Sequence, residues 1–428
     1  MEKTKTRIFN RYQVFIIAML AILSFTVILD FMVLSPLGAI LLEQLNIKTS
    51  QFGLVVSVYA FSAGASGLLA AGFADKFDRK KLLLFFYTGF MLGTLLCAIA
   101  PTYHFLLVAR VVTGLFGGVI GSISMAIISD LFAMEVRGRV MGFTQMGFAA
   151  SQVLGIPIGL WLANKFGWHS PFWMITGFGT VVGLIIAKYM KPVDKHLKAH
   201  SDRNAFQHLG KVISEPNYLR AFVATTLLAT GGFMMMPFGS AFAIGNLGLT
   251  MEQLPTLYLI TGICSIVIGP LAGKASDKIG KYPMFCIGTI ISIVIVIFYT
   301  NLGITALWKV VLLNVILFVG IMSRMISASA LMTAIPKMSD RGAFMSVNAS
   351  IQQISGGIAA AVAGLIVVQD NSGKLFHYNT LGLVVSGSMI LTMIMLYFLN
   401  RYITRQRHIN TGPANDTLIK TETAPAFE

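Results

Sequence analysis

The chain is poor in charge for its length. Asp, Glu, Lys and Arg together make up only 11% of its 428 residues, whereas a soluble domain carries about 25%. A soluble protein of this length needs an extensive polar surface, which so few charged side chains do not provide. The composition therefore excludes an ordinary soluble protein and indicates a chain that uses lipid as its solvent.

Cysteine is also scarce, with only Cys97, Cys264 and Cys286, each inside an apolar run. This pattern favours small buried side chains over a disulfide framework or a metal site. The sequence also lacks a phosphate-binding loop, a metal-spaced histidine pair and a nucleophile elbow. We therefore expect a protein that is not an enzyme, binds no cofactor or metal, and draws its energy from an ion gradient.

Apolar residues are abundant, at 56% of the chain, with a mean hydropathy of +0.77. They gather in twelve runs, and about 20 residues are enough to span the core of a bilayer. Unpaired backbone groups are costly in hydrocarbon, so each run is predicted to be helical. The runs cover 12–40, 51–73, 80–100, 103–128, 139–163, 169–190, 218–245, 253–275, 282–301, 305–331, 341–368 and 378–400.

The distribution of basic residues predicts an orientation. If the amino terminus is cytoplasmic, 26 of the 32 Lys and Arg residues lie on the cytoplasmic side, and four lie on the other, Lys48, Lys165, Lys309 and Lys374. Such an imbalance follows the positive-inside rule and places both termini in the cytoplasm. The positive charge is thus a topology signal that also favours anionic lipid, and no nucleic acid is expected as a partner. We expect a multi-pass protein of a bacterial plasma (inner) membrane.

Two short phrases occur twice, about 200 residues apart. Asp75-Lys76-Phe77-Asp78-Arg79-Lys80 recurs as Asp277-Lys278-Ile279-Gly280-Lys281, and Arg137-Gly138 recurs as Arg341-Gly342. Repetition at half length predicts two related membrane halves, which is typical of transporters.

Domain boundaries follow from the repeat and from one long polar connection. We expect a six-helix bundle at 1–190, a cytoplasmic connector at 191–217, a second six-helix bundle at 218–402 and a disordered cytoplasmic tail at 403–428. Within the connector, 205–213 fits either a short amphipathic helix on the membrane surface or a solvated linker.

The phrase after the second and eighth apolar runs resembles motif A of the major facilitator superfamily, Gly-x-x-x-Asp-(Arg/Lys)-x-Gly-(Arg/Lys). The second copy matches from Gly273 to Lys281, whereas the first has Ala71 and Asp78 where the motif has glycine. A carboxylate here is able to accept hydrogen bonds from a neighbouring helix N-terminus and to pair with adjacent cations. The alternative is a solvated turn that obeys the positive-inside rule alone. The residues expected to form a conformational latch are Asp75, Lys76, Arg79, Asp277, Lys278 and Lys281.

Three further stretches carry the same resemblance. Arg110 and the glycine-rich face after it resemble motif B, and Gly155, Pro157 and Gly159 resemble motif C, which is associated with antiporters. Asp30 lies in a segment similar to the first helix of the twelve-helix drug:proton antiporters. The resemblance covers nearly the whole chain. It implies an all-α membrane protein with twelve transmembrane helices in two pseudo-symmetric six-helix bundles, around a cavity lined mainly by helices one, four, seven and ten.

Three full charges lie well inside apolar runs: Asp30, Arg110 and Arg324. Each costs about 2.5–3.5 kcal/mol at a helix centre, so such residues usually face a cavity and function there. The alternative is a structural ion pair. Asp30 and Arg110 both fall about 12–15 Å below the outer surface at 1.5 Å per residue, which allows them to pair and makes Asp30 the candidate proton carrier.

No apolar run supplies Arg324 with a carboxylate, so its partner is a polar side chain, lipid or an anionic substrate. The polar side chains in the same half are Asn314, Asn348, Gln352 and Gln353.

Flexible and polar side chains are the candidates for lining the cavity. Methionine repacks around different ligands, although a Met-rich stretch equally fits ordinary helix packing. The candidates are Phe233, Met234, Met235, Gln145, Gln152, Asn348 and Gln352.

The leading hypothesis is proton-coupled export of small amphipathic or hydrophobic molecules by a monomer that works by alternating access. An alternative is a uniporter or symporter of an organic anion, a carboxylate or sugar derivative. The basis is that the membrane spans contain two arginines but only one aspartate. A third hypothesis, a non-transporting membrane sensor or a lipid scramblase, predicts no solute flux in proteoliposomes. The fold alone does not choose among them.

Overall fold

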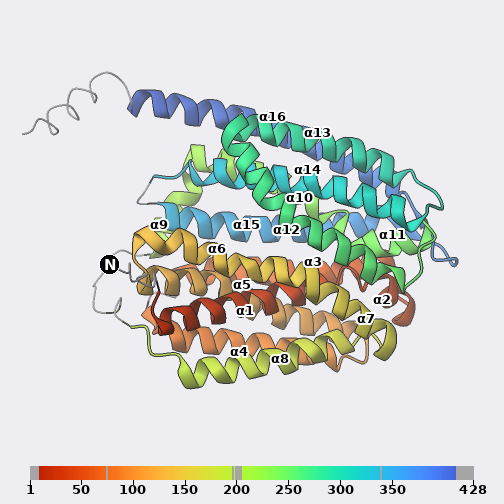
Figure 1. Ribbon diagram of the computed structural model, residues 1–428, viewed down its shortest axis with the longest axis horizontal. Helices are drawn as coiled ribbons and strands as arrows, with labels where there is room; N and C mark the ends of the chain where they lie inside the picture. The colour runs from red at the N-terminus through yellow and green to blue at the C-terminus, as the bar shows by residue number, and fades with distance from the viewer. Residues whose placement is uncertain (1–8, 74–75, 195–196, 198–204, 338–339, 411–428) are drawn as a thin grey trace, which may run out of the picture.

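The computed structural model describes residues 9–410, apart from 74–75, 195–196, 198–204 and 338–339. Within this part, twelve helical spans are long and apolar enough to cross a membrane, one for each apolar run. The spans lie side by side along one direction, and the described chain begins and ends at the same end of the bundle (Figure 1). The predicted twelve-helix membrane fold is confirmed.

Short breaks divide some spans into more than one helix. The first half contains α1 (Arg11–Val33), α2 (Gly38–Gln44), α3 (Thr49–Phe73), α4 (Arg79–Ala98), α5 (Tyr103–Leu131), α6 (Met134–Ala150), the π-helical turn η2 (Ser151–Gly155), α7 (Ile156–Phe166) and α8 (Ser170–Tyr189). After α9 (Ala205–Ser214), the second half contains α10 (Pro216–Phe233), the 3₁₀ turn η4 (Met236–Phe238), α11 (Gly239–Gly245), α12 (Gln253–Ile279), α13 (Lys281–Thr300), α14 (Leu307–Thr333), α15 (Arg341–Ile366), a two-stranded antiparallel hairpin of β1 (Val368–Gln369) and β2 (Leu375–Phe376), and α16 (Tyr378–Asn410).

The first helix of each half is interrupted, although runs 12–40 and 218–245 were expected to be continuous. α1 ends at Val33 and a turn carrying Pro36 leads into α2, while α10 ends at Phe233 and η4, which contains Pro237, leads into α11. Proline has no N–H to donate and its ring clashes with the preceding turn, so a helix kinks or ends there. A helix break beside a proline therefore occurs at corresponding positions in both halves.

The repeated Arg-Gly phrase makes the same contact in both halves. The Nη2 atom of Arg137 donates to the carbonyl of Ser129, eight residues earlier, at the end of α5. The Nη2 atom of Arg341 donates to the carbonyl of Thr333, also eight residues earlier, at the end of α14. A cation at a helix C-terminus satisfies free carbonyls and complements the helix dipole. The repeat in sequence thus reflects a repeated structural unit.

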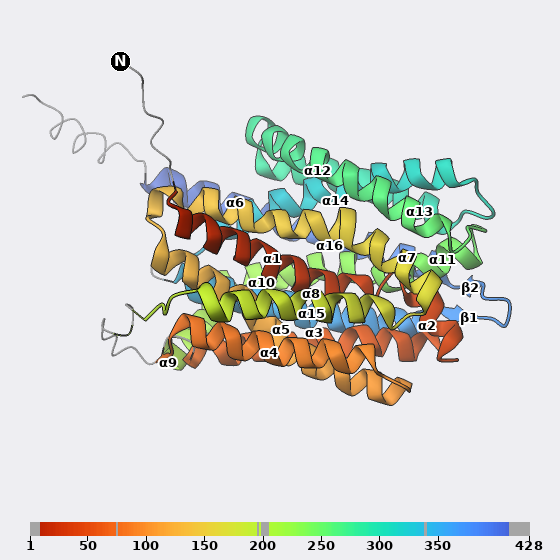
Figure 2. The ribbon, with the colours of Figure 1, turned by 60° about the horizontal axis from the view of Figure 1, so that its bottom comes forward.

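The two halves meet mainly where α3 packs along α15 and where η2 and α7 pack on α12 (Figure 2). Small residues allow the close approach of α3 and α15: a Cβ atom at Gly53 would lie 2.7 Å from the carbonyl oxygen of Ala360. The Ser57 hydroxyl also donates across this interface to the carbonyl of Gly357, at 2.8 Å. Small side chains and interhelical hydrogen bonds of this kind hold helices together in lipid.

The connector contains the helix α9, which packs against α3, α10 and α15. Val212 is buried there, and His208 lies 3.7 Å from the carboxylate of Asp340, just before α15. The connector thus contains a helix that rests on the protein's own helices. Of the predicted tail, only 403–410 lies within the described residues, and it continues α16.

Candidate functional site

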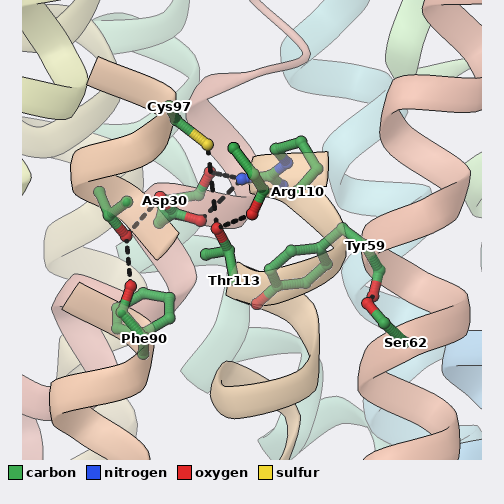
Figure 3. A network of polar contacts seen from close by, with 9 residues as sticks. Asp30, Tyr59, Ser62, Phe90, Cys97, Arg110 and Thr113 are labelled. Carbon is green, nitrogen blue, oxygen red and sulfur yellow. Dashed lines mark hydrogen bonds and ion pairs between the residues drawn. The ribbon is translucent and has the colours of Figure 1, made fainter. Parts of the chain in front are cut away.

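A buried ion pair joins the first and fourth spans. The Nη1 atom of Arg110, on α5, lies 2.8 Å from Oδ2 of Asp30, on α1, and both side chains are fully buried at 0% exposure. Figure 3 shows the two groups facing each other between their helices. The equal depths expected from the sequence thus correspond to a direct contact.

Neighbouring side chains complete the surroundings of this pair. The Thr94 hydroxyl, on α4, lies 3.1 Å from Oδ1 of Asp30, so each carboxylate oxygen has a partner. The guanidinium of Arg110 lies 4.4 Å from the ring centre of Tyr59, on α3. Close by, Cys97 and Thr113 contact each other through Sγ and Oγ1 at 3.8 Å. Four helices therefore converge on the pair of Asp30 and Arg110 (Figure 3).

The guanidinium of Arg110 is only partly satisfied. No described residue accepts a hydrogen bond from its Nε or Nη2, although both are buried donors. Buried polar groups without a partner are costly, so the pair depends strongly on the single contact with Asp30. Protonation of that carboxylate would remove its charge and leave Arg110 with little to hold it. The arrangement is therefore chemically suited to change shape when a proton binds.

The glycines of the motif C segment bring the fifth span against α1 next to this pair. A Cβ atom at Gly155 would lie 2.5 Å from the side chain of Leu29, and one at Gly159 would lie 3.0 Å from Val33. Pro157 follows η2, where the π-helical turn absorbs the change in hydrogen bonding ahead of the proline. These close contacts fall one residue before Asp30 and three residues after it in the sequence.

An aromatic contact connects the pair to the second half. The ring of Phe31, the residue after Asp30, lies 5.1 Å from Tyr59 and 5.9 Å from Phe233, on α10. Phe233 in turn packs against Gly356 on α15, where a Cβ atom would lie 2.9 Å from the ring. A displacement of α1 near Asp30 would therefore be transmitted directly to α10 through the contact of Phe31 with Phe233.

Arg324, on α14, is also buried, with 4% of its surface exposed. No described residue accepts a hydrogen bond from its Nε or Nη2, and its guanidinium lies 5.6 Å from the ring centre of Phe285. Among the polar partners considered, Asn348 instead accepts a hydrogen bond from Thr225 at 2.6 Å. The structure therefore does not bring these amides to the free guanidinium nitrogens of Arg324.

The candidate lining residues occupy different surroundings. Met234 is buried in the hydrophobic core, and Phe233 and Met235 pack against that core from the break in the seventh span. Gln152 is buried in η2 and Gln352 is half-buried on α15. Gln145 lies on α6, and its side chain is outside the described part of the chain. Met234 is thus part of the packing between helices, while Met235 and Met236 are only partly buried.

The first copy of motif A forms an interhelical contact that sequence reasoning did not identify. Nε of Arg79 lies 3.2 Å from Oδ2 of Asp130, near the end of α5. Asp78, which replaces the expected glycine, caps α4 by accepting from the backbone N–H groups of Lys80 and Lys81. Lys76 is exposed, and Asp75 lies outside the described residues.

The second copy of motif A is more local. Lys281, which is half-buried, donates to the largely exposed Asp277 one turn away, and Lys278 is exposed as well. Gly280 has φ of +106°, the left-handed conformation that favours glycine at this turn. The two copies thus share a position in the fold but differ in their partners.

Comparison with known proteins agrees with this architecture. The model of the Major Facilitator Superfamily matches residues 20–360 and also 221–422. The chain belongs to the major facilitator superfamily. It is a multi-pass membrane transporter of that superfamily, as its resemblance to motifs A, B and C predicted.

Individual relatives do not agree on one substrate. An uncharacterised transporter of this superfamily from Bacillus subtilis (strain 168), YceJ, is 28% identical over 61% of this chain and 67% of its own. Multidrug resistance protein 3 of the same organism is 31% identical over 36% of this chain and 30% of its own. The solved structure of the nucleoside transporter NupG has a TM-score of 0.70 at 15% identity, covering 90% of this chain and 99% of its own. That structure supports the fold alone.

Proposed function

We propose that this transporter exports small amphipathic or hydrophobic molecules in exchange for protons. The observation that carries the proposal is the fully buried pair of Asp30 and Arg110. Its carboxylate is the only acidic group that lies deep within a membrane span of the described chain. A proton-coupling group needs two protonation states that favour different conformations of the protein. An ion pair that is broken by protonation supplies them.

The proposed cycle follows from these contacts. While Asp30 is ionised, Arg110 and Thr94 hold α1, α4 and α5 together. When Asp30 takes up a proton, the ion pair is lost and α1 becomes free to shift against its neighbours. Because Phe31 touches Phe233, that shift is transmitted to α10 in the other half. Release of the proton on the opposite side restores the pair.

Several features of the chain enter the same proposal. The division into bundles at 1–190 and 218–402 supplies the two moving bodies, around a cavity lined by spans one, four, seven and ten. The excess of basic residues supports an orientation with both termini in the cytoplasm, and we propose that the membrane is a bacterial plasma membrane. Arg79 and Asp130, together with Asp277 and Lys281, serve as the conformational latch, without contacting the cargo. The name of Multidrug resistance protein 3 is in keeping with export of such molecules.

The test is transport in proteoliposomes with an imposed pH gradient. The probes are three fluorescent amphipathic dyes, one cationic (ethidium), one neutral (Nile red) and one anionic (anilinonaphthalene sulfonate). Wild type should accumulate at least one dye against its gradient, and Asp30→Asn should bind that dye but not accumulate it. The amide mimics the protonated carboxyl and does not titrate. Accumulation that survives in Asp30→Asn would show that another group carries the proton, and absence of flux for every dye would favour a non-transporting protein.

A further inference from the structure

The second half of the molecule holds a buried positive charge that the proposed proton cycle does not use. Arg324 is 4% exposed, and neither its Nε nor its Nη2 has a hydrogen-bond partner among the described residues. In the first half, Arg110 is neutralised by Asp30 at 2.8 Å. The two buried arginines therefore differ: Asp30 is the counter-ion of Arg110, whereas no described residue supplies one to Arg324.

The second half offers no acidic side chain at the depth of Arg324. From 216 to 410 the sequence contains four acidic residues, which all lie at helix ends or in connections: Glu252, Asp277, Asp340 and Asp370. Arg324 is instead near the middle of its span, seventeen residues after the start of α14. A charged group in such a position normally pairs with an opposite charge or faces a polar ligand.

The guanidinium of Arg324 lies close to α10 at a glycine. A Cβ atom at Gly231, on α10, would lie 3.7 Å from Nη2 of Arg324 and 3.3 Å from the hydroxyl of Ser388, on α16. On the other side, the ring of Phe285 covers the guanidinium. Unpaired guanidinium nitrogens, the Ser388 hydroxyl and the Phe285 ring thus lie near Gly231, which has no side chain.

A hollow of about 300 Å³ lies further along α14, between α12, α13, α14 and α16. Its wall includes Ser276, Asp277, Lys281, Ala330 and Leu331, and it does not reach Arg324 itself. The hydroxyl of Ser276 is hydrogen bonded to that of Ser327, one turn beyond Arg324. The hollow is at the end of the bundle that the charge distribution predicts to be cytoplasmic.

We propose that Arg324 binds the acidic group, a carboxylate or a phosphate, of an amphipathic cargo. Planar guanidinium donors match these groups in a paired geometry, and the surrounding apolar helices suit the remainder of such a molecule. This inference rests on the proposed transport function and specifies the charge of what is carried. The same chemistry exists in the headgroup of an anionic lipid, so the experiment separates the two sources.

The experiment measures binding and requires no gradient. Wild type and Arg324→Gln are placed in nanodiscs of phosphatidylcholine, and their unfolding temperature is followed against decanoate, decanol and decyltrimethylammonium. Decanoate should stabilise the wild type, decanol and decyltrimethylammonium should do so less, and Arg324→Gln should bind decanoate at least tenfold more weakly. Lys309→Gln, which removes an exposed charge from the start of α14, is the matched control and should bind like the wild type.

A second measurement separates a ligand site from a structural cation. Without ligand, Arg324→Gln should unfold at the same temperature as Lys309→Gln or higher, because it removes a buried charge that lacks a counter-ion. A much lower unfolding temperature, or an unchanged response to decanoate, would overturn the inference. The same proteins are also measured in nanodiscs that contain phosphatidylglycerol. If this lipid stabilises the wild type but not Arg324→Gln, and decanoate stabilises neither, the site binds lipid and the inference is overturned. Transport by Asp30 variants is measured separately. A negative binding result for Arg324 would therefore not contradict the proton cycle, and a negative transport result for Asp30 would not contradict anion binding by Arg324.

Discussion

Ser35 and Met236, 201 positions apart in sequence, are joined by a hydrogen bond from the Ser35 hydroxyl to the Met236 carbonyl. The Ser240 hydroxyl returns the contact by donating to the carbonyl of Ser35 at 3.1 Å. Both partners stand at the proline breaks of their halves, beside Pro36 and Pro237. The breaks free backbone carbonyls, which the opposite half then satisfies. These two hydrogen bonds, from Ser35 to Met236 and from Ser240 to Ser35, are called the clasp. The clasp joins the two halves at the end of the bundle where α1 ends.

Loss of the clasp should loosen that end of the molecule. A hydrogen bond contributes about 1 kcal/mol, so Ser240→Ala should increase opening about fivefold. Hydrogen exchange of peptides from α2 and α11, followed by mass spectrometry, measures it. Thr230→Ala removes only a bond within α10 and should leave exchange at these peptides unchanged. Equal exchange in Ser240→Ala and wild type would show that the hydrogen bond from Ser240 does not hold the halves together.

The pair of Asp30 and Arg110 should show strong coupling in a double-mutant cycle. Asp30→Asn and Arg110→Gln each leave a buried group without its partner, at a cost of about 3–5 kcal/mol. The double variant removes both charges and should recover part of this loss. Unfolding in detergent micelles gives the free energies, with Thr94→Val as a reference for losing the hydroxyl hydrogen bond to Asp30 while the ion pair remains. If the two single losses simply add, the pair contributes nothing as a pair.

The contact between Arg79 and Asp130 should affect the rate of the cycle and leave binding intact. Arg79→Gln removes the 3.2 Å contact between α4 and α5, worth about 1.5–3 kcal/mol for a charged hydrogen bond. We expect changed turnover of a dye in proteoliposomes at unchanged dye affinity. Lys81→Gln, on the same turn but exposed, is the control. Normal turnover with lost affinity would place Arg79 in the cargo site.

The hairpin between α15 and α16 should be sensitive to acid. Oδ1 of Asp370 accepts from the hydroxyl of Ser372 at 2.7 Å and from the N–H groups of Ser372 and Lys374, both at 2.9 Å. These bonds, the Ser372 hydroxyl first, hold the pKa of Asp370 below its usual value. A lowered pKa in the folded state means that the stabilisation is present above the unfolded pKa and is lost as pH falls through the folded one.

Hydrogen exchange checks this expectation. After correction for the intrinsic rates, protection of the segment 366–378 should fall as the pH is lowered from about 5 toward 2, while peptides from α14 keep theirs. Asp370→Asn should lose protection at neutral pH and respond little to acid. A hairpin equally protected at both ends of this range would mean that Asp370 does not hold it.

The fold was predictable from sequence because hydrocarbon leaves few options for the backbone. Long apolar runs, the positive-inside bias and the repeat were enough to predict twelve spans in two halves. The interruptions were missed even though Pro36 and Pro237 are visible, because proline is tolerated in membrane helices when neighbours satisfy the freed carbonyls. That satisfaction, through Ser35 and Ser240, is a tertiary contact between halves.

The candidate site was predictable only in its charges. Asp30, Arg110 and Arg324 stand out because charge is rare and costly in a membrane span. Thr94 and Tyr59 carry no such signal, since hydroxyl and aromatic residues are common in these helices. Asp130 was missed because its partner Arg79 lies 51 residues earlier, and only the packing of α4 on α5 brings them together.

In the proposed proton cycle, the complete burial of Asp30 limits the leak of protons. A carboxylate with no exposed surface exchanges protons with neither compartment while the helices stay in this arrangement. A proton leak would then have to wait for α1 to move, and its rate would follow the rate of that movement instead of the diffusion of protons through water. Tight coupling in such a transporter would come from the slowness of opening a sealed contact, without any separate barrier to protons.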